Sequence, residues 1–249
     1  MTNTYSELRS TPSPLARPDR VLTIGAHPDD AEFGAGATVA RWAAGGTDVT
    51  MCIVTDGSMG SWDPDMDPAA LARRRTAEQE RAADLLGVSQ VVYLGHVDGE
   101  LEYSTDLRRE LASQVRLHRP DVVFTHDPWQ RYQLHPDHRA VGMAAVDGIV
   151  TAREPLAMRE SGLDAHRPSS ILLWSADQPD HAEPVDAVWF ERKVEALLCH
   201  SSQAGTTMGD ADAGEAERER FVERMQRWHE ESGVQVGTGP AETFKRLTP

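Results

Sequence analysis

The sequence predicts a layered α/β fold with a mostly parallel central sheet. Short apolar segments rich in β-branched residues alternate with longer segments whose apolar residues recur at helical spacing, and this strand–helix–strand order repeats four times. No internal repeat of 20–50 residues suggests a solenoid or propeller instead. A strand followed by a helix and another strand forms a parallel βαβ unit, so we expect one sheet between helical layers.

Five segments have the character of β-strands. Each is short, contains many β-branched residues, and ends at a Gly, Asp, His or Ser that interrupts the apolar run. The predicted strands are residues 21–25, 48–55, 90–94, 121–125 and 170–174. Open α/β sheets bind ligands beyond the carboxyl ends of their strands, so the residues that follow these segments are candidates for a functional site.

Six segments between and after the strands have helical periodicity. In the first, apolar residues step along one face from Phe33 onward, and Gly45 and Gly46 end the helix. In another, an apolar stripe begins at Leu107 and stops before Pro120. The predicted helices cover residues 31–44, 67–86, 107–118, 136–152, 187–198 and 214–229.

Composition restricts the class of protein. The chain has 249 residues, of which 39% are apolar, and a net charge of −15, so it is long enough to bury a core. Basic residues cluster only at 73–75, and acidic residues follow closely. This distribution excludes non-specific binding to nucleic acid or to an anionic membrane as the main role. Cys52 and Cys199 are too few for a disulfide framework or a thiolate zinc site.

The chain is expected to contain one domain after a short arm. Residues 1–18 are rich in Ser, Thr and Pro and are predicted to form a flexible N-terminal arm, whereas residues 19–249 are predicted to form a single domain. No segment approaches the roughly 18 consecutive apolar residues of a membrane span. The N-terminus lacks the apolar region of a signal peptide, so we expect a cytoplasmic protein.

Histidines and carboxylates follow two of the predicted strands. His27, Asp29 and Asp30 come directly after the first strand, and His135 and His138 lie at the start of the helix beyond the fourth. Imidazole and carboxylate groups together suit a divalent metal in a catalytic site. Asp29 or Asp30 could instead cap the following helix, and His135 could be an ordinary loop residue. The spacing leaves open which carboxylate and which histidine would bind an ion.

These motifs resemble those of the PIG-L/LmbE family of zinc-dependent N-deacetylases. The resemblance rests on AHPDDAE at residues 26–32 and HPDH at residues 135–138, and shorter matches extend it from about residue 20 to about residue 205. It implies a Rossmann-like fold and a single LmbE-like deacetylase domain over residues 19–249. It also implies that the chain removes an acetyl group from an N-acetylated amino-sugar conjugate.

The resemblance implies a role for each motif residue. His27, Asp30 and His138 correspond to the ligands of one zinc ion per chain, whose place another divalent metal could take. Asp29 corresponds to the general base that activates water. His135 corresponds to the residue that stabilises the oxyanion or protonates the leaving amine.

Three further residues are candidates for substrate binding. Arg75 and Asp98 match positions that contact the sugar in some family members, although Arg75 could equally lie on a solvated helix face and Asp98 in a plain turn. Tyr132 stands one residue before the position that holds a tyrosine in some sugar deacetylases of the family. Trp62 and Trp129 could stack on a sugar ring, but packing within the core or their loops is the favoured interpretation.

The sequence therefore predicts a hydrolase of linear amide bonds that acts on a small-molecule N-acetyl amino-sugar conjugate. The alternative is a catalytically inactive member of the family that binds metal and acts as an interaction protein. A metallophosphoesterase is disfavoured, because it would need more carboxylates to bridge two ions. The sequence does not specify the conjugate, and it is compatible with a homo-oligomer.

Overall fold

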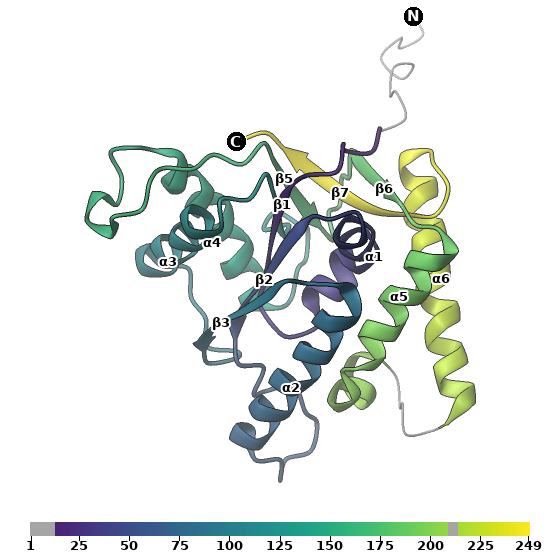
Figure 1. Ribbon diagram of the computed structural model, residues 1–249. Helices are drawn as coiled ribbons and strands as arrows, with labels where there is room; N and C mark the ends of the chain where they lie inside the picture. The colour runs from purple at the N-terminus through teal and green to yellow at the C-terminus, as the bar shows by residue number, and fades with distance from the viewer. Residues whose placement is uncertain (1–12, 209–213) are drawn as a thin grey trace, which may run out of the picture.

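The computed structural model describes residues 13–208 and 214–249, which form a central sheet covered by helices (Figure 1). The helices are α1 (Asp30–Ala44), α2 (Pro68–Leu86), α3 (Thr105–His118), α4 (Pro136–Arg153), α5 (Ala187–Leu198) and α6 (Glu215–Val236). The strands are β1 (Arg20–Gly25), β2 (Asp48–Thr55), β3 (Gln90–His96), β4 (Val122–His126), β5 (Ser170–Trp174), β6 (His181–Pro184) and β7 (Ala241–Leu247). Short helical turns are η1 (Arg159–Ser161), η2 (Ser201–Gln203) and η3 (Ala204–Met208).

The strands form one sheet in the order β3-β2-β1-β4-β5-β7-β6. β1 to β5 run parallel, and β7 pairs antiparallel with β5 and with β6. The predicted layered α/β fold with a mostly parallel sheet is therefore confirmed. The chain adds β2 and β3 on one side of β1 and then β4 and β5 on the other. Ligands bind where the strand order reverses in this way, which is here the crevice beyond β1 and β4.

Helices cover both faces of the sheet (Figure 1). The apolar stripes of α3 and α4 pack on one face, against strand residues such as Leu22 and Val123. α1, α2 and α5 cover the other face, where the rings of Trp42 and Phe124 lie 5.5 Å apart between centroids. α6 contacts α5, β6 and β7. Because both faces are covered, the central strands β1 and β4 are buried almost along their whole length and do not alternate between buried and exposed residues.

The five predicted strands and six predicted helices are all present, and their ends lie within two residues of those expected except at the end of α6. The sequence does not predict β6 and β7. β6 consists of the four residues HAEP. Glutamate and proline are uncommon in strands, so this segment does not have the composition of a strand. In β7, the carboxylate of Glu242 is buried because it accepts hydrogen bonds from the N–H groups of Ala37 and Thr38 in α1. α6 runs to Val236, seven residues beyond the predicted end at 229.

Part of the predicted N-terminal arm, residues 1–12, lies outside the described residues. Beyond it, the N–H of Leu15 donates to Oε1 of Glu183 at 2.8 Å, and the hydroxyl of Thr47 donates to the carbonyl of Pro18 at 2.7 Å. The chain is thus attached to the sheet region before β1 begins. The extent of the single domain stays a prediction. Among the described residues, no helix has both the length and the apolar character required to cross a membrane.

Candidate active site

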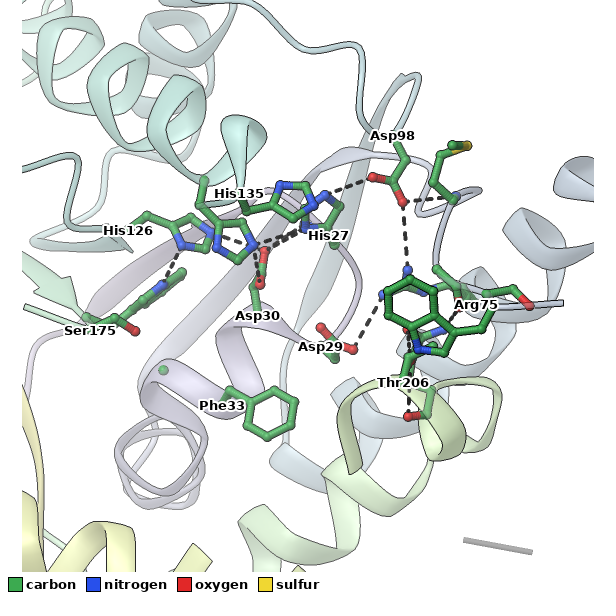
Figure 2. A pocket seen from close by; sticks show the side chains of 18 residues that line it. His27, Asp29, Asp30, Phe33, Arg75, Asp98, His126, His135, Ser175 and Thr206 are labelled. Carbon is green, nitrogen blue, oxygen red and sulfur yellow. Dashed lines mark hydrogen bonds and ion pairs between the residues drawn. The ribbon is translucent and has the colours of Figure 1, made fainter. Parts of the chain in front are cut away.

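The residues that follow β1 and β4 meet at the carboxyl edge of the sheet and line a cavity of about 410 Å³ (Figure 2). His27, Asp29 and Asp30 enter it from the turn between β1 and α1. His135 and His138 enter it from the start of α4. The structure therefore brings together the five residues of the two motifs that the sequence singled out as catalytic or metal-binding.

Three of these side chains present donor atoms at the spacing of metal ligands. Nδ1 of His27 lies 3.2 Å from Nε2 of His138. Oδ1 of Asp30 lies 3.2 Å from Nε2 of His138, and Oδ2 lies 3.5 Å from Nδ1 of His27. Zinc bonds of about 2.0–2.1 Å at tetrahedral angles place neighbouring ligand atoms about 3.3 Å apart. The spacing of each pair is compatible with a shared divalent ion, and the donor atoms of Asp30, His126 and His138, like those of His27, His135 and His138, lie within 4.8 Å of one another.

Carboxylates contact the other ring nitrogen of His27. Nε2 lies 3.1 Å from Oδ1 of Asp98 and 3.1 Å from Oδ2 of Asp137, which also accepts the N–H of Gly99. Burial alone lowers the pKa of His27, but hydrogen bonds to Asp137, Asp30 and Asp98 raise it well above its ordinary value. Such a carboxylate contact is typical of metal-bound histidines, because it fixes the tautomer and the ring orientation.

His126, the last residue of β4, supports Asp30 from the opposite side. The indole N–H of Trp174 donates to Nδ1 of His126 at 3.0 Å, so Nε2 carries the proton and donates to Oδ2 of Asp30 at 3.1 Å. Burial lowers the pKa of His126 to about 4, which keeps the ring neutral. Burial also acts to raise the pKa of Asp30, but the imidazoles of His138 and His126 hold it well below its usual range.

Asp29 is the N-cap residue of α1, yet its side chain makes no capping hydrogen bond, so the capping alternative is wrong for this residue. Its buried carboxylate lies 3.4 Å from Nη2 of Arg75, and its N–H donates to Oε1 of Gln79 at 3.0 Å. Burial raises the pKa of Asp29 to about 6, although Arg75 opposes the shift. A carboxyl that titrates close to neutral pH can both accept and return a proton under working conditions.

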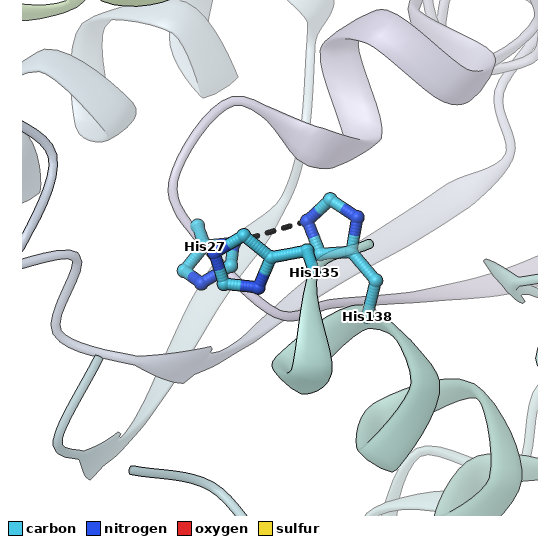
Figure 3. Close-up of side chains that lie close together, drawn as sticks. All are labelled: His27, His135 and His138. Atoms are coloured by element: carbon cyan, nitrogen blue, oxygen red, sulfur yellow. Dashed lines mark hydrogen bonds between the residues drawn. The ribbon is translucent and has the colours of Figure 1, made fainter. Parts of the chain in front are cut away.

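His135 stands immediately before α4 with its ring beside two other imidazoles (Figure 3). The ring centroids of His27 and His138 lie 4.5 Å and 4.7 Å from it. Burial, followed by electrostatic interaction with His27 and His138, lowers the pKa of His135, which favours the neutral ring. Its Nδ1 accepts the N–H of Asp137 at 3.3 Å and so helps to cap α4. The Nε2–H group is then left as the donor of this cavity-lining side chain.

Arg75 and Asp98 both line the cavity and are both buried. Arg75 donates to the carbonyls of Gly57 at 3.0 Å and Pro28 at 2.6 Å, so the alternative of a solvated helix face is wrong. Asp98 accepts the N–H of Met59 at 3.1 Å and lies 4.0 Å from Nη1 of Arg75. The two side chains therefore place a cation and a carboxylate on one wall of the cavity.

Tyr132 differs from the other candidates, because its side chain is 86% exposed and is not among those that line the cavity. Its role in substrate binding stays a prediction without geometric support. One residue that the sequence did not single out lies at the site, Gln79, whose side chain accepts the N–H of Asp29. Gln79 follows Arg75 by four residues on α2, and this spacing on one helix face could have identified it. Gln203, which lines the cavity, belongs to the last of the shorter matches to the family, where it had no assigned role.

A Rossmann-like fold with imidazoles and carboxylates gathered beyond β1 and β4 defines the class of LmbE-like amide hydrolases. The sequence model of the PIG-L family, described as GlcNAc-PI de-N-acetylase, matches residues 22–149. The chain belongs to the PIG-L family. It is accordingly a hydrolase that acts on amide bonds, as its named relatives are deacetylases.

Relatives and solved structures agree with this assignment. A diacetylchitobiose deacetylase of Thermococcus kodakarensis is 35% identical over 187 residues, which cover 74% of this chain and 70% of that protein. A 1D-myo-inositol 2-acetamido-2-deoxy-α-D-glucopyranoside deacetylase of Kineococcus radiotolerans is 35% identical over 169 residues, covering 55% of this chain and 46% of that protein. The N,N'-diacetylchitobiose deacetylase of Pyrococcus horikoshii superposes with a TM-score of 0.82 at 30% identity, covering 93% of this chain and 84% of that one.

Proposed function

We propose that this chain removes an acetyl group from an N-acetylated amino-sugar conjugate by metal-assisted hydrolysis of the amide. The observation that carries the proposal is one cavity in which the donors of His27, Asp30 and His138 stand beside the buried carboxyl of Asp29. The names of the relatives support the substrate class, since they act on acetylated amino sugars. An inactive metal-binding member is not favoured, because His27, Asp29, Asp30, His135 and His138 are all present and all line the cavity.

We propose zinc, one ion per chain, as the metal held by His27, Asp30 and His138. Two imidazole nitrogens and one carboxylate oxygen are ligands typical of a catalytic zinc site. Zinc bound there would polarise the amide carbonyl and would lower the pKa of a bound water to about 7. Asp98 and Asp137 orient His27, and His126 orients Asp30, through the contacts described above.

Asp29 is the proton carrier in this proposal. It takes a proton from the attacking water as the water oxygen bonds to the acyl carbon, and it returns a proton to the nitrogen as the C–N bond breaks. The products are acetate and the free amine. The pKa of about 6 suits both steps, and Arg75 at 3.4 Å stabilises the ionised form that accepts the proton.

The neighbouring side chains bind and orient the substrate. Neutral His135 donates from Nε2 to the oxygen that develops negative charge in the transition state. Arg75 and Asp98 together offer a donor and an acceptor to sugar hydroxyl groups on the same wall. This arrangement would position the acetamido group between Asp29 and His135.

Acetate release tests the activity. We expect the zinc-loaded protein to release acetate from members of a panel that includes N-acetylglucosamine, N,N'-diacetylchitobiose and N-acetylglucosaminyl-inositol. A chelator should abolish release, and zinc should restore it. Metal analysis should give close to one ion per chain. If the fully loaded protein releases no acetate from any member of a broad amide panel, the inactive alternative is correct instead.

Two substitutions separate metal binding from proton transfer. Asp29→Asn should retain the metal but lower kcat by a factor of about 10²–10⁴, because the amide cannot accept the proton. His27→Ala should lose both the metal and the activity. Asp177→Asn, an exposed carboxylate outside the cavity, is the matched control and should behave as wild type. Normal turnover by Asp29→Asn would show that another group is the base.

A further inference from the structure

Trp62 lines the reaction cavity with 81% of its surface exposed. The interpretation that it packs within its own loop is therefore wrong. Tryptophan is strongly buried on average, because leaving an indole in water is unfavourable. Ligand-binding cavities are lined mainly by apolar and aromatic side chains, so an indole at the wall of this cavity is available to contact a ligand. The position of this side chain therefore needs an explanation that internal packing does not supply.

The loop that carries Trp62 is fixed to the site through its backbone. The carbonyl of Gly57 accepts a hydrogen bond from Nη1 of Arg75 at 3.0 Å, and the carbonyl of Gly60 accepts one from Nε2 of Gln203 at 3.0 Å. A Cβ atom at Gly60 would lie 2.4 Å from Nη1 of Arg75, so a side chain at this position would force the guanidinium to move. The indole is therefore attached to a docked segment of the cavity wall.

Trp62 belongs to the outer part of the cavity, whereas the groups assigned to the reaction lie deep within it. His27 and Asp29 are each only 6% exposed. Figure 2 shows Arg75 and Asp98 on the side of the cavity opposite His126, and the Trp62 loop is docked on that same Arg75. An acetamido group that reaches Asp29 therefore leaves the remainder of the substrate near the rim.

We propose that Trp62 forms a second subsite, in which its indole stacks on the ring attached to the reacting amino sugar. This inference rests on the proposed function, because the reacting sugar is what places a further ring at the rim. The ring is either a second pyranose, which offers a face of C–H groups, or an aryl aglycone, which offers a π face. Both present the flat apolar surface that an indole binds. The preferred substrate is thus a conjugate of at least two rings rather than a free monosaccharide.

Kinetics on three substrates test the subsite: N-acetylglucosamine, N,N'-diacetylchitobiose and 4-nitrophenyl N-acetyl-β-glucosaminide. Trp62→Ala should lower kcat/KM about tenfold for two-ring substrates, mainly through KM, and less than about twofold for the monosaccharide. Trp62→Phe should restore most of the loss, since it keeps an aromatic face. A loss confined to diacetylchitobiose identifies a sugar ring as the occupant, and a loss confined to the nitrophenyl substrate identifies an aryl group.

Trp129→Ala is the matched control. Trp129 is also an exposed tryptophan, at 57%, but it lines a separate cavity with Asp127 and Lys245. Its replacement should leave the three kcat/KM values unchanged. If Trp62→Ala lowered kcat/KM equally for the one-ring and two-ring substrates, the proposed subsite would be wrong. Such a result would mean that the loop affects catalysis by positioning Arg75. Unchanged kinetics on all three substrates would overturn it as well.

A binding measurement keeps the inference separate from the proposed function. Chitobiose, the deacetylated disaccharide, is titrated into the metal-free protein while tryptophan fluorescence is recorded. We expect a saturable change in the wild type and in Trp129→Ala, and its loss in Trp62→Phe. If wild type binds chitobiose in this way but releases no acetate, the proposed function fails and the ring subsite stands. If it releases acetate but chitobiose gives no signal from Trp62, the subsite fails alone.

Discussion

Asp29 has a backbone conformation that few residues adopt. Its φ of 98° is positive, and a strained conformation of this kind costs about 1–3 kcal/mol and persists only where neighbouring groups hold it. Gln79 is the neighbour that holds it here. This fully buried side chain accepts the N–H of Asp29 and donates to the carboxylate of Glu32. Gln79 of α2 therefore holds the backbone of the proposed base, while Arg75 contacts its carboxylate.

Replacing Gln79 with leucine should lower kcat about tenfold while KM and metal content change little. The N–H of Asp29 would lose its acceptor, which costs about 1–3 kcal/mol and lets the carboxylate turn away. The donors of His27 and Asp30 would remain in place. Steady-state kinetics and metal analysis test this outcome, with Gln114→Leu on α3 as the control. A lower melting temperature with unchanged kcat would instead assign Gln79 a structural role only.

Arg116 joins two elements, because its side chain in α3 closes the C-terminal end of α4. The last carbonyls of a helix have no partner within the helix, and a cation there also compensates the helix dipole. The buried guanidinium of Arg116 donates to six carbonyl groups: those of Thr151, Ala152, Glu154, Ala157, Met158 and Leu163. The opposite end of α4 carries His135 and His138, so this contact helps to place the helix that supplies them.

Arg116→Met should lower the free energy of unfolding by about 3 kcal/mol, because several buried carbonyls would lose a charged donor. Arg109→Met on the same helix is the control, since Arg109 pairs with Glu160 at the surface. Exposed pairs of that kind contribute roughly 0–1 kcal/mol. Denaturant unfolding of the three proteins measures the difference. Equal losses in the two variants would contradict the capping role of Arg116.

At the scale of the whole molecule, a buried cluster ties the C-terminal elements to α1. Lys193 in α5 donates to Glu242 in β7 and to the carbonyl of Phe33 in α1, both at 2.7 Å. Nε2 of His229 in α6 lies 3.1 Å from the same ammonium, and its Nδ1 contacts the carbonyl of Met225 at 2.6 Å. Nδ1 therefore carries the ring proton, and Nε2 accepts from Lys193. This arrangement requires neutral His229.

Acid should weaken this cluster. Burial and then the charge of Lys193 lower the pKa of His229 to about 4, whereas a free histidine titrates near about 6.5. Between these values the unfolded chain binds more protons than the folded one. The contribution of neutral His229 to the free energy of unfolding is therefore complete above about pH 6.5. It is lost as the pH falls towards 4, and the total loss is roughly 3 kcal/mol.

Unfolding of the metal-free protein between about pH 4 and pH 7 measures this dependence. The free energy of unfolding should fall with acid in the wild type, and it should fall less in His229→Gln, which cannot titrate. Lys193 and Glu242 remain in both proteins, so the difference between the two curves reports His229. Parallel curves would show that other groups cause the acid sensitivity.

The main elements of the fold could be predicted because their signals are local. A run such as residues 48–55 is β-branched and apolar, and a helix that begins after Asp67 and ends at Gly87 carries its own start and stop residues. β7 carries no such signal, because its buried Glu242 is stabilised by N–H groups of α1 more than 200 residues away in the sequence. Local periodicity cannot predict a carboxylate that is buried for this reason.

The sequence by itself determined the order of the elements and, through the two histidine motifs, the residues gathered beyond β1 and β4. Only the tertiary structure decided that Arg75 and Asp98 face the cavity, that Tyr132 does not, and that Trp62 stays in water at its rim. The physical reason is that periodicity and turn chemistry act between near neighbours. Burial and ligand spacing instead depend on which distant segments pack together, and that is settled only when the sheet is complete.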